Sequence, residues 1–456
     1  MYDPRRVDLG KVVAPPYDVI SPEDRRRYYE QDPHNVVRLI SGEVLPTDTA
    51  DDNKYLRAAR FFSEWLDAGI LRREPRPAMY VYRHDFVDPT TGESRTRQGV
   101  LAVVELEPFG TGILPHERTH ARAKADRLSL TRAVGANLSP IFALYDDPAS
   151  TVAHQLRSIT AGTPQLALTA EDGDRHSVWS ITDVNAFRGL ASVLSRSRLY
   201  IADGHHRYET ALNFRDKMRL EHPEAPPDAA FNYVLTLLVD LTDPGLVILP
   251  THRIVHDLEG FDGERLVGSL KARYAVRPYR DQAGLLAAMH APTLDHRIGL
   301  AFVDSPSPLW GASLTSPSPL WGGSPTSPSP LWGGSGRGLI YMTIDIPRAP
   351  SSDPVSALGV TVLHRDILQK ELGLEDELVE REQHLSYSRD LPAVLSRVER
   401  GSAQAAFLLR PPAVSDVAAV AQAGQVMPQK STYFYPKPAS GIVFNPLDPG
   451  IRIPSL

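Results

Sequence analysis

The stretch that decides the fold reads LYIADGHHRYETA and covers residues 199–211. Its first four residues form a short apolar run typical of a buried strand, and apolar residues recur at helical spacing from Tyr208 onward. Gly204 predicts a tight turn between the two elements. The turn carries an acid, two imidazoles and a guanidinium, namely Asp203, His205, His206 and Arg207.

The chemistry of this turn predicts a site for an oxyanion such as phosphate. Backbone N–H groups at the start of a helix lack partners within the helix, and the helix dipole favours negative charge there. An alternative stays open, in which Asp203 caps the helix, the two histidines lie on the surface and Arg207 pairs with a nearby acid.

The composition is typical of a soluble globular protein with two or three structural units. The chain has 456 residues, of which 42% are apolar and 23% charged. The net charge of -6, with lysine and arginine spread along the chain, disfavours a DNA partner. Because the sequence has neither an apolar run of roughly 18 residues nor a signal-peptide pattern, we expect a cytoplasmic protein without a membrane partner. The absence of cysteine excludes disulfides, thiolate zinc sites and thiol nucleophiles.

The patterns along the chain predict an α+β fold of mixed sheets with flanking helices. Amphipathic spacing predicts a helix over residues 51–71. Alternation and turn residues predict strands at 79–83 and 96–104, joined as a hairpin, and at 141–145, 166–181 and 196–202. Another strand pair is expected at 231–240 and 246–253, across the turn 243–245.

We divide the chain into four segments. Residues 1–150 form an N-terminal α+β part, residues 151–304 a central part with the 203–207 turn, and residues 337–456 a C-terminal α+β part. Residues 305–336 hold three copies of SPSPLWG, and their composition favours extended or disordered chain. We interpret this repeat as the expanded loop of a hairpin between strands at 302–303 and 338–342, with a binding module as the alternative.

Near the N-terminus, residues 11–20 read KVVAPPYDVI, an apolar run that two prolines interrupt. We interpret it as a strand end that places Tyr17 and Asp18 in an ordered loop, as substrate contacts. A rigid surface turn is the alternative. Ser21 then predicts a helix start, since a proline and the acid of a capping box follow it.

Residues 116–120 read HERTH and fit the HExxH pattern of zinc peptidases. The preceding glycine and proline place His116 in a loop or at the very start of a helix, and no strong candidate for a third ligand follows. Acid–base chemistry by His116 and Glu117 is the second interpretation, because a lysine, an aspartate and an arginine follow within twelve positions. A charged, solvated helix is the third.

Residues 424–437 read GQVMPQKSTYFYPK and combine lysines, hydroxyl groups and aromatic rings. We interpret them as a lid or phosphate-contacting loop that uses Lys430, Ser431 and Thr432, or as a packed surface loop. Before them, helices are expected at 356–372 and 414–423, with a strand at 405–409.

Six motifs occur in an order that closely resembles the domain-of-unknown-function family 1015 of bacteria and archaea. They are VAPPYDV from Val13, the block from His116 to Leu128, SPIF from Ser139, ADGHHRY from Ala202, PTHR from Pro250 and MPQKST from Met427. The resemblance covers nearly the whole chain except the repeat, and the family has no settled activity. Its members carry a further strand ahead of residues 2–11, and their His-Glu-x-Thr pattern does not need His120, which disfavours zinc.

The 203–207 turn is also similar, over some tens of residues, to the ParB and sulfiredoxin-like fold, which includes free serine kinases. This similarity implies a nucleotide-binding unit in which Gly204, His205, His206 and Arg207 bind phosphates. Asp203 would hold the turn or contact metal or substrate.

Together these features predict a nucleotide-dependent kinase or phosphotransferase that uses ATP or ADP with Mg²⁺ on a small hydroxyl compound, such as free serine. A ParB-like nucleotide-binding regulator and a phosphate-ester hydrolase are the alternatives. The candidate catalytic residues are Glu117, the preferred base, with His116, Asp203 and His206. The candidate phosphate contacts are Gly204, His205, Arg207, Arg253, Lys430, Ser431 and Thr432, and the substrate contacts are Tyr17, Asp18 and His252. We assign no residue as a metal ligand.

Overall fold

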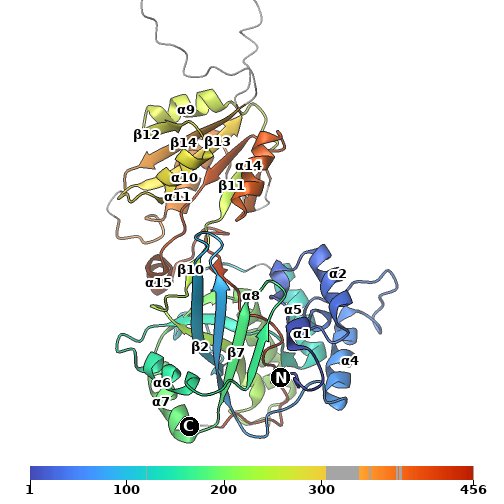
Figure 1. Cartoon of the computed structure of the whole chain (residues 1–456). Helices are drawn as coiled ribbons and strands as arrows, with labels where there is room; N and C mark the ends of the chain where they lie inside the picture. Colours follow the sequence, from blue (N-terminus) through green and yellow to red (C-terminus); the bar gives the residue numbers. More distant parts are fainter. Residues whose placement is uncertain (120, 304–337, 349–350, 376–377, 379–382, 455–456) are drawn as a thin grey trace, which may run out of the picture. The chain divides into compact units, whose positions relative to one another are not determined.

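The computed structural model describes residues 1–119, 121–303, 338–348, 351–375, 378 and 383–454 (Figure 1). The chain forms two compact units. The first unit contains Met1–Ile248, Ala413–Met427 and Tyr433–Leu456, and the second contains Leu249–Pro412 and Pro428–Thr432. The interpretation of residues 305–336 as an expanded loop and the proposed role of His120 fall outside the described residues, and the four sequence segments stay predictions.

The first unit is built on an eight-stranded mixed sheet with the strand order β3-β8-β5-β9-β2-β1-β7-β6. Its strands are β1 (Met79–Val87), β2 (Ser94–Glu105), β3 (Ile113–Leu114), β5 (Ile141–Tyr145), β6 (Leu166–Thr169), β7 (Arg175–Ile181), β8 (Leu199–Asp203) and β9 (Tyr233–Asp240). The pairs β3–β8 and β5–β9 are parallel, and the remaining neighbours are antiparallel. Two further pairs join β4 (Ala136–Asn137) to β18 (Asn445–Pro446), and β10 (Val247–Ile248) to β17 (Phe434–Tyr435).

The expected hairpin of β1 and β2 is confirmed, with Tyr80 opposite Leu101. The expected pairing of residues 231–240 with 246–253 is wrong. Strand β9 is buried along almost its whole length and pairs with β2 on one side and β5 on the other, so both of its edges are occupied. The second run divides instead into β10, which pairs with β17, and a strand of the second unit.

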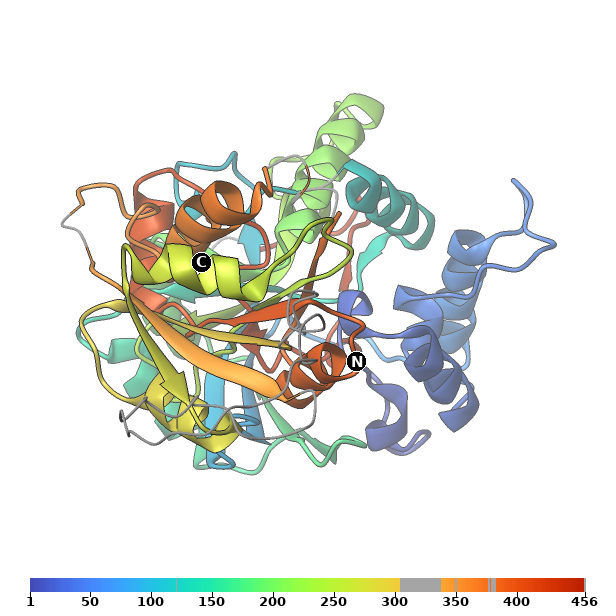
Figure 2. The same cartoon turned by 90° about the horizontal axis from the view of Figure 1, so that it is seen from above.

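Helices surround the sheet of the first unit. They are α1 (Leu9–Val12), α2 (Pro22–Gln31), α3 (Val37–Ile40), α4 (Lys54–Asp67), α5 (Ala121–Val134), α6 (Thr151–Thr160), α7 (Val184–Leu194), α8 (His205–Glu221) and α15 (Val414–Gln422), with the 3-10 turns η1 (Tyr17–Val19) and η2 (Ala230–Asn232). The first four helices, drawn in blue, gather in one group (Figure 2). The capping box at Ser21 is confirmed.

Residues 11–20 do not end a strand, which corrects the interpretation of the KVVAPPYDVI run. Asp8 accepts the Gly10 N–H at 3.1 Å and starts the single turn α1, which takes up the first part of the run. Only Ala14 pairs like a strand residue, in an isolated bridge with Ser440. The 3-10 turn η1 then positions Tyr17 and Asp18.

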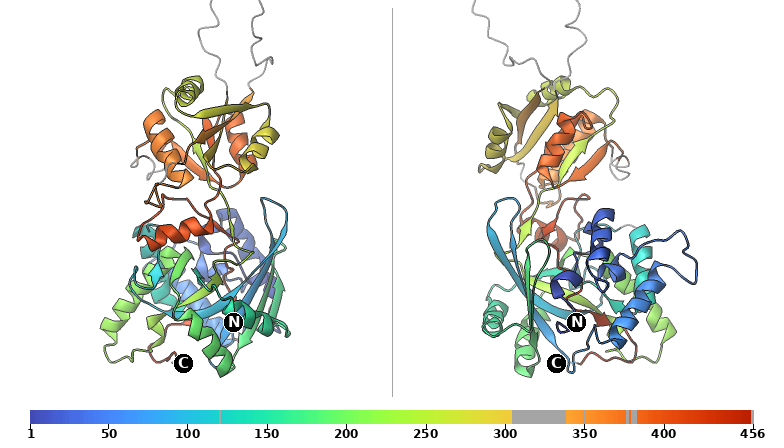
Figure 3. Two further views of the ribbon diagram at one scale, coloured as in Figure 1. Left: turned by 90° about the vertical axis from the view of Figure 1, so that its left-hand side faces the viewer. Right: turned by 45° about the vertical axis from the view of Figure 1, so that its right-hand side comes forward.

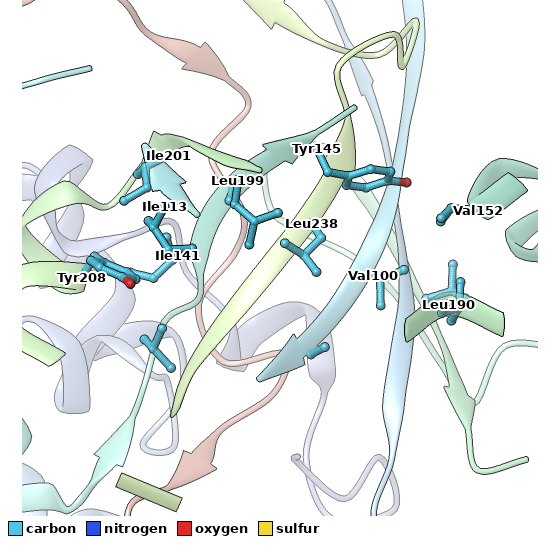
Figure 4. Close-up of a cluster of buried hydrophobic side chains, with 14 of the residues drawn as sticks. Val100, Ile113, Ile141, Tyr145, Val152, Leu190, Leu199, Ile201, Tyr208 and Leu238 are labelled. Carbon is cyan, nitrogen blue, oxygen red and sulfur yellow. The ribbon is translucent and has the colours of Figure 1, made fainter. Parts of the chain in front are cut away.

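One face of the sheet packs on a large apolar core (Figure 4). Strand residues such as Val100 and Leu238 meet Val152 of α6, Leu190 of α7 and Tyr208 of α8 there. Side chains alternate along a strand, so the opposite face carries the neighbouring positions, including Phe142. That face is covered by the chain after residue 433, since the rings of Phe142 and Phe434 lie 5.9 Å apart.

The second unit contains a six-stranded antiparallel sheet with the order β12-β14-β13-β16-β11-β15. Its strands are β11 (His252–Val255), β12 (Ala275–Tyr279), β13 (His296–Val303), β14 (Leu339–Ile346), β15 (Leu385–Ser388) and β16 (Ala405–Leu408). Helices α9 (Gly263–Lys271), α10 (Gln282–His290) and α14 (Leu391–Glu399), and the helical run α11 (Gly359–Leu363), η4 (His364–Gln369) and α12 (Lys370–Leu372), lie on its two faces (Figure 3). The expected hairpin is confirmed, with Val303 opposite Leu339.

These observations confirm the α+β class with mixed sheets and flanking helices. Among the described residues, no helix is both long and apolar enough to cross a membrane.

Candidate functional site

The predicted strand–turn–helix unit is present at residues 199–211. Strand β8 ends at Asp203, Gly204 adopts φ 95°, and α8 begins at His205. This left-handed conformation is costly for any residue with a Cβ atom. A Cβ at Gly204 would in addition lie 3.1 Å from the Arg207 guanidinium, so that side chain would have to move by a few tenths of an ångström.

The alternative interpretation of the turn is right about Arg207, which pairs with a nearby acid, but wrong about Asp203, which does not cap α8, and about His205, which is buried. Gly204 occupies the N-cap position, and a glycine has no side chain that could cap the helix. The Asp203 carboxylate instead pairs with the Arg207 guanidinium, and its Oδ1 lies 2.6 Å from Lys437 Nζ. The N-terminal backbone of α8 thus opens beside two cations that share one carboxylate.

Lys437 joins three distant parts of the sequence. Its ammonium pairs with Asp18 of η1 as well as with Asp203, and its side chain is only 8% exposed. Burial by itself would lower the pKa of Lys437, but the two carboxylates outweigh burial and raise it. Burial would likewise raise the pKa of Asp18, but Lys437 and Arg207 lower it. Lys437 and Asp18 therefore both stay charged at neutral pH.

Tyr17 lies next to this group of charges. The Arg127 guanidinium carbon is 3.9 Å from the centre of the Tyr17 ring, a cation–π contact. Both residues line a small cavity of about 50 Å³, together with Ser139, Arg207 and Thr210. The structure therefore brings Tyr17 and Asp18 to the 203–207 turn, as the substrate-contact prediction requires.

The HERT segment meets the start of α8 through His205. The His116 N–H donates to His205 Nε2 at 3.2 Å, so this nitrogen is the acceptor. The proton of the neutral ring is then on Nδ1, which faces Glu117 Oε2 at 3.5 Å. Thr119 donates to Glu209 of α8 at 2.8 Å, which further fixes the segment.

His116 and His205 are both neutral at pH 7. Burial lowers the pKa of His116 to about 4. Burial also places the pKa of His205 well below its usual range, and the nearby His116, His206 and Lys437 act in the same direction. His206 is half-buried in the first turn of α8, and its carbonyl accepts from Thr210 at 2.7 Å. A neutral His205 can position the Glu117 carboxylate through its Nδ1–H without neutralising the negative charge of the carboxylate.

The zinc interpretation of residues 116–120 gains no support. His120 lies outside the described residues, and within the described parts of the chain no three His, Asp or Glu side chains are placed to hold a metal ion.

Five predicted site residues belong to the second unit: His252, Arg253, Lys430, Ser431 and Thr432. The buried Arg253 guanidinium donates to Thr251 O at 2.5 Å and Gln429 O at 3.2 Å, and its Nε lies 3.4 Å from His364 Nε2. Burial lowers the pKa of Arg253 to about 10. The roles of all five in phosphate or substrate binding stay predictions.

The sequence interpretation missed Lys437 and three polar residues of the covered sheet face: His84, Arg97 and His176. The alternation of β1, β2 and β7 could have indicated these three, because it places them on the same face. Arg97 is fully buried and donates to Pro436 O at 2.6 Å. Lys437 lies at the end of the predicted 424–437 loop, but the sequence did not indicate its ion pairs, because the partners lie more than two hundred residues away.

The fold and the site define an α+β protein with a charged strand–glycine–helix turn at the edge of a buried polar face. The chain belongs to the DUF1015 family, described as a protein of unknown function, whose model matches residues 1–309. This confirms the resemblance, although the matched region is shorter than the nearly complete coverage expected. Among curated proteins, none matches the sequence.

Several solved structures share a broad similarity. A conserved hypothetical protein from Pyrococcus furiosus has 14% identity and a TM-score of 0.31, over 74% of this chain and 91% of its own. A free serine kinase in complex with AMP has 13% identity and a TM-score of 0.32, over 73% and 86%. A C-terminally truncated SbnI from Staphylococcus aureus has 10% identity and a TM-score of 0.30, over 73% and 82%. Similarity at this level assigns no activity to the chain.

Proposed function

We propose that the protein is a nucleotide-dependent phosphotransferase that phosphorylates a small hydroxyl compound. One observation carries the proposal: the start of α8, with a glycine at its N-cap, lies beside Arg207 and Lys437, while Glu117 Oε2 lies 3.5 Å from His205 Nδ1 at the same turn. Phosphoryl transfer needs positive groups around the moving phosphate and a carboxylate that orients the acceptor hydroxyl. We further propose that residues around the turn form a ParB/sulfiredoxin-like nucleotide-binding unit.

The proposed reaction uses these groups as follows. The terminal phosphate lies at the N-terminus of α8, where backbone N–H groups and Arg207 bind its oxygens. Glu117 takes the proton of the acceptor hydroxyl while the acceptor oxygen bonds to phosphorus. The bond from phosphorus to the bridging oxygen breaks, and the nucleotide leaves with that electron pair. Lys437 stabilises the charge that develops on the transferred group.

The nucleotide would be ATP or ADP with Mg²⁺. Magnesium is commonly bound by one or two carboxylates together with phosphate oxygens, and it neutralises phosphate charge. Asp18 and Asp203 are the carboxylates of the turn that fit this role. Tyr17, next to them, would contact the acceptor. Within the second unit, we propose Arg253, Lys430, Ser431 and Thr432 as phosphate contacts and His252 as a substrate contact.

The test is incubation of the purified full chain with ATP or ADP, Mg²⁺ and a pool of amino acids and polyols that includes L-serine. Mass spectrometry should detect one phosphorylated product, and Glu117→Gln should lower its rate by about 10²–10⁴-fold, the usual contribution of a general base. Glu221→Gln, on the exposed side of α8, is the matched control and should leave the rate unchanged.

Calorimetry separates the alternatives. A chain that binds no nucleotide overturns the proposal. Nucleotide binding without transfer would favour the ParB-like regulator. Release of phosphate from an ester without any nucleotide would favour the hydrolase. If the chain binds a nucleotide, Glu117→Gln should bind it with an affinity within a few-fold of the unaltered chain, because the carboxylate acts on the acceptor.

A further inference from the structure

A second, larger cavity of about 200 Å³ lies within the first unit. Its walls come from the N-terminal segment 10–19, helix α2, the turn between β6 and β7, and the segment 433–439. His84 and His176 of the covered sheet face also line it. Apart from Lys437, none of the residues used for the proposed phosphotransfer lines this cavity.

The two histidines form an uncharged, rigid part of the wall. They are directly opposite each other on β1 and β7, with ring centres 4.2 Å apart. Tyr82 bonds His176 Nδ1 at 2.7 Å, and Arg97 lies 3.5 Å from His84 Nδ1. Burial places the pKa of both histidines well below the usual range, and Arg97 contributes to this shift.

Three carboxylates border the cavity on one turn: Glu171, Asp172 and Asp174. Asp174 is held by His84 Nε2 at 2.8 Å, and Arg27 lies 3.5 Å from Glu171. Partial burial raises the pKa of Asp174 to about 6 and also raises the pKa of Asp172, although the Asp174 N–H, which donates to Asp172 Oδ1 at 3.1 Å, acts against this second shift. Glu171 and Asp172 are still exposed to solvent, and the turn as a whole contributes negative charge at the border of the cavity.

Three tyrosine rings complete the cavity: Tyr28, Tyr433 and Tyr435. Burial raises the pKa of Tyr435 to about 12, and Asp174 and Asp172 raise it further, so its ring lies in the field of these acids. The one lysine of the lining, Lys437, is already paired with Asp18 and Asp203 and lies 5.3 Å from the centre of the Tyr433 ring. The Arg27 guanidinium carbon lies 5.2 Å from the centre of the Tyr28 ring, so Tyr435 is the ring considered for a bound cation. Aromatic faces beside carboxylates are the combination that binds organic cations.

We propose that this cavity is a binding site for a small organic ammonium ion, held by Asp174 and Asp172 and packed against Tyr435. A metal ion fits less well, because no three suitable side chains converge in the described residues. An ammonium group suits two carboxylates and aromatic rings without a fixed coordination geometry. The site does not depend on the proposed phosphotransfer and is tested without nucleotide.

The test is calorimetric titration of the full chain with propylammonium chloride, with 1-butanol as a neutral probe of similar shape. We expect saturable binding of propylammonium and no measurable binding of 1-butanol. Asp174→Asn keeps the shape of the side chain and its contact with His84, and should weaken binding about tenfold. Tyr435→Leu should weaken it about threefold to tenfold, through loss of the ring.

Glu93→Gln removes one exposed carboxylate from the β1–β2 turn and is the control for net charge. It should bind propylammonium like the unaltered chain. Thermal unfolding of each variant confirms that the fold is kept. Equal binding of the neutral probe, or unchanged affinity in both Asp174→Asn and Tyr435→Leu, would overturn the proposal. A failure of phosphotransfer with intact propylammonium binding would concern the proposed function alone.

Discussion

Lys437 is the residue on which the candidate site depends most. Its ammonium stands between Asp18 and Asp203, two carboxylates from distant parts of the sequence. Lys437 is the buried member of the group, with 8% of its side chain exposed, while Asp18 is 37% exposed and Asp203 also pairs with Arg207. The buried ammonium therefore depends on the two carboxylates more than either carboxylate depends on it.

Replacing Lys437 by methionine should destabilise the first unit. Asp203, whose side chain is 14% exposed, would keep only Arg207, and Asp18, which is 37% exposed, would lose its lysine, so the free energy of unfolding should fall by about 1–3 kcal/mol. Urea denaturation followed by circular dichroism measures the change. Adding Asp18→Asn to Lys437→Met should recover part of the loss, because one of the two stranded charges is removed.

Lys11→Met is the matched control for Lys437→Met. Lys11 is exposed and lies 3.9 Å from Asp8, so its loss should change the free energy of unfolding by less than about 1 kcal/mol. Equal losses in Lys11→Met and Lys437→Met would contradict the role given to the buried group.

His116 makes the stability of the first unit depend on pH. Its pKa is about 4 in the folded chain, against about 6.5 when unfolded. The unfolded chain thus binds more protons in this window, and the stabilisation, complete above pH 6.5, is lost as the pH falls toward 4. The loss from His116 is about 3 kcal/mol, and the other buried histidines act in the same direction.

Urea midpoints measured between pH 7 and pH 4.5 test this dependence. His116→Gln should give a flatter curve than the unaltered chain. His154→Gln, which replaces an exposed histidine of α6, should leave the slope unchanged. A His116→Gln curve as steep as the original would refute the assignment.

At the scale of the element, the turn between β8 and α8 combines backbone strain with a close contact. Gly204→Ala would introduce a Cβ at φ 95° and 3.1 Å from the Arg207 guanidinium. Gly110 has φ 97° with no atom near its hypothetical Cβ. Gly110→Ala should therefore cost about 1–2 kcal/mol from backbone strain alone, and Gly204→Ala measurably more.

The difference between these two alanine variants reports the contact with Arg207. Denaturation midpoints of both, measured at one pH, give it directly. Equal losses would show that Arg207 moves away freely and that the glycine is needed only for its backbone conformation.

Elements with local signals were predictable from the sequence. The β8 turn, the capping box at Ser21 and the β13–β14 hairpin each depend on residues that are close in sequence or flank one insertion. The partner of β9 was not predictable in this way, since an apolar strand pairs equally well with any neighbour. The ion pair of Asp203 with Lys437 was not predictable either, because the spacing of residues in the sequence does not encode long-range ion pairs.

At the scale of the whole molecule, the repeat lies between two strands that pair directly. Val303 and Leu339 face each other, so a short turn can connect β13 and β14. Replacing residues 304–338 by a four-residue loop should keep the second unit folded. Its free energy of unfolding should stay the same or rise by up to about 2 kcal/mol, because a shorter loop costs less closure entropy.

Differential scanning calorimetry of the shortened and the full chain tests this expectation. Loss of the second unit's unfolding transition would show that the repeat contributes to folding. Unchanged phosphotransfer in the shortened chain would separate the repeat from the candidate site.

The order of the chain also has a consequence for biosynthesis. The second unit is made largely from residues 249–412, and residues 433–456, which follow it in the sequence, belong to the first unit. Before these residues are synthesised, Arg97 lacks its hydrogen bond to Pro436 O, and Asp203 lacks its ion pair with Lys437. A nascent chain that has completed its eight-stranded sheet therefore still exposes the partly charged face around Arg97 to solvent. We expect a chaperone to be most useful at this stage of translation.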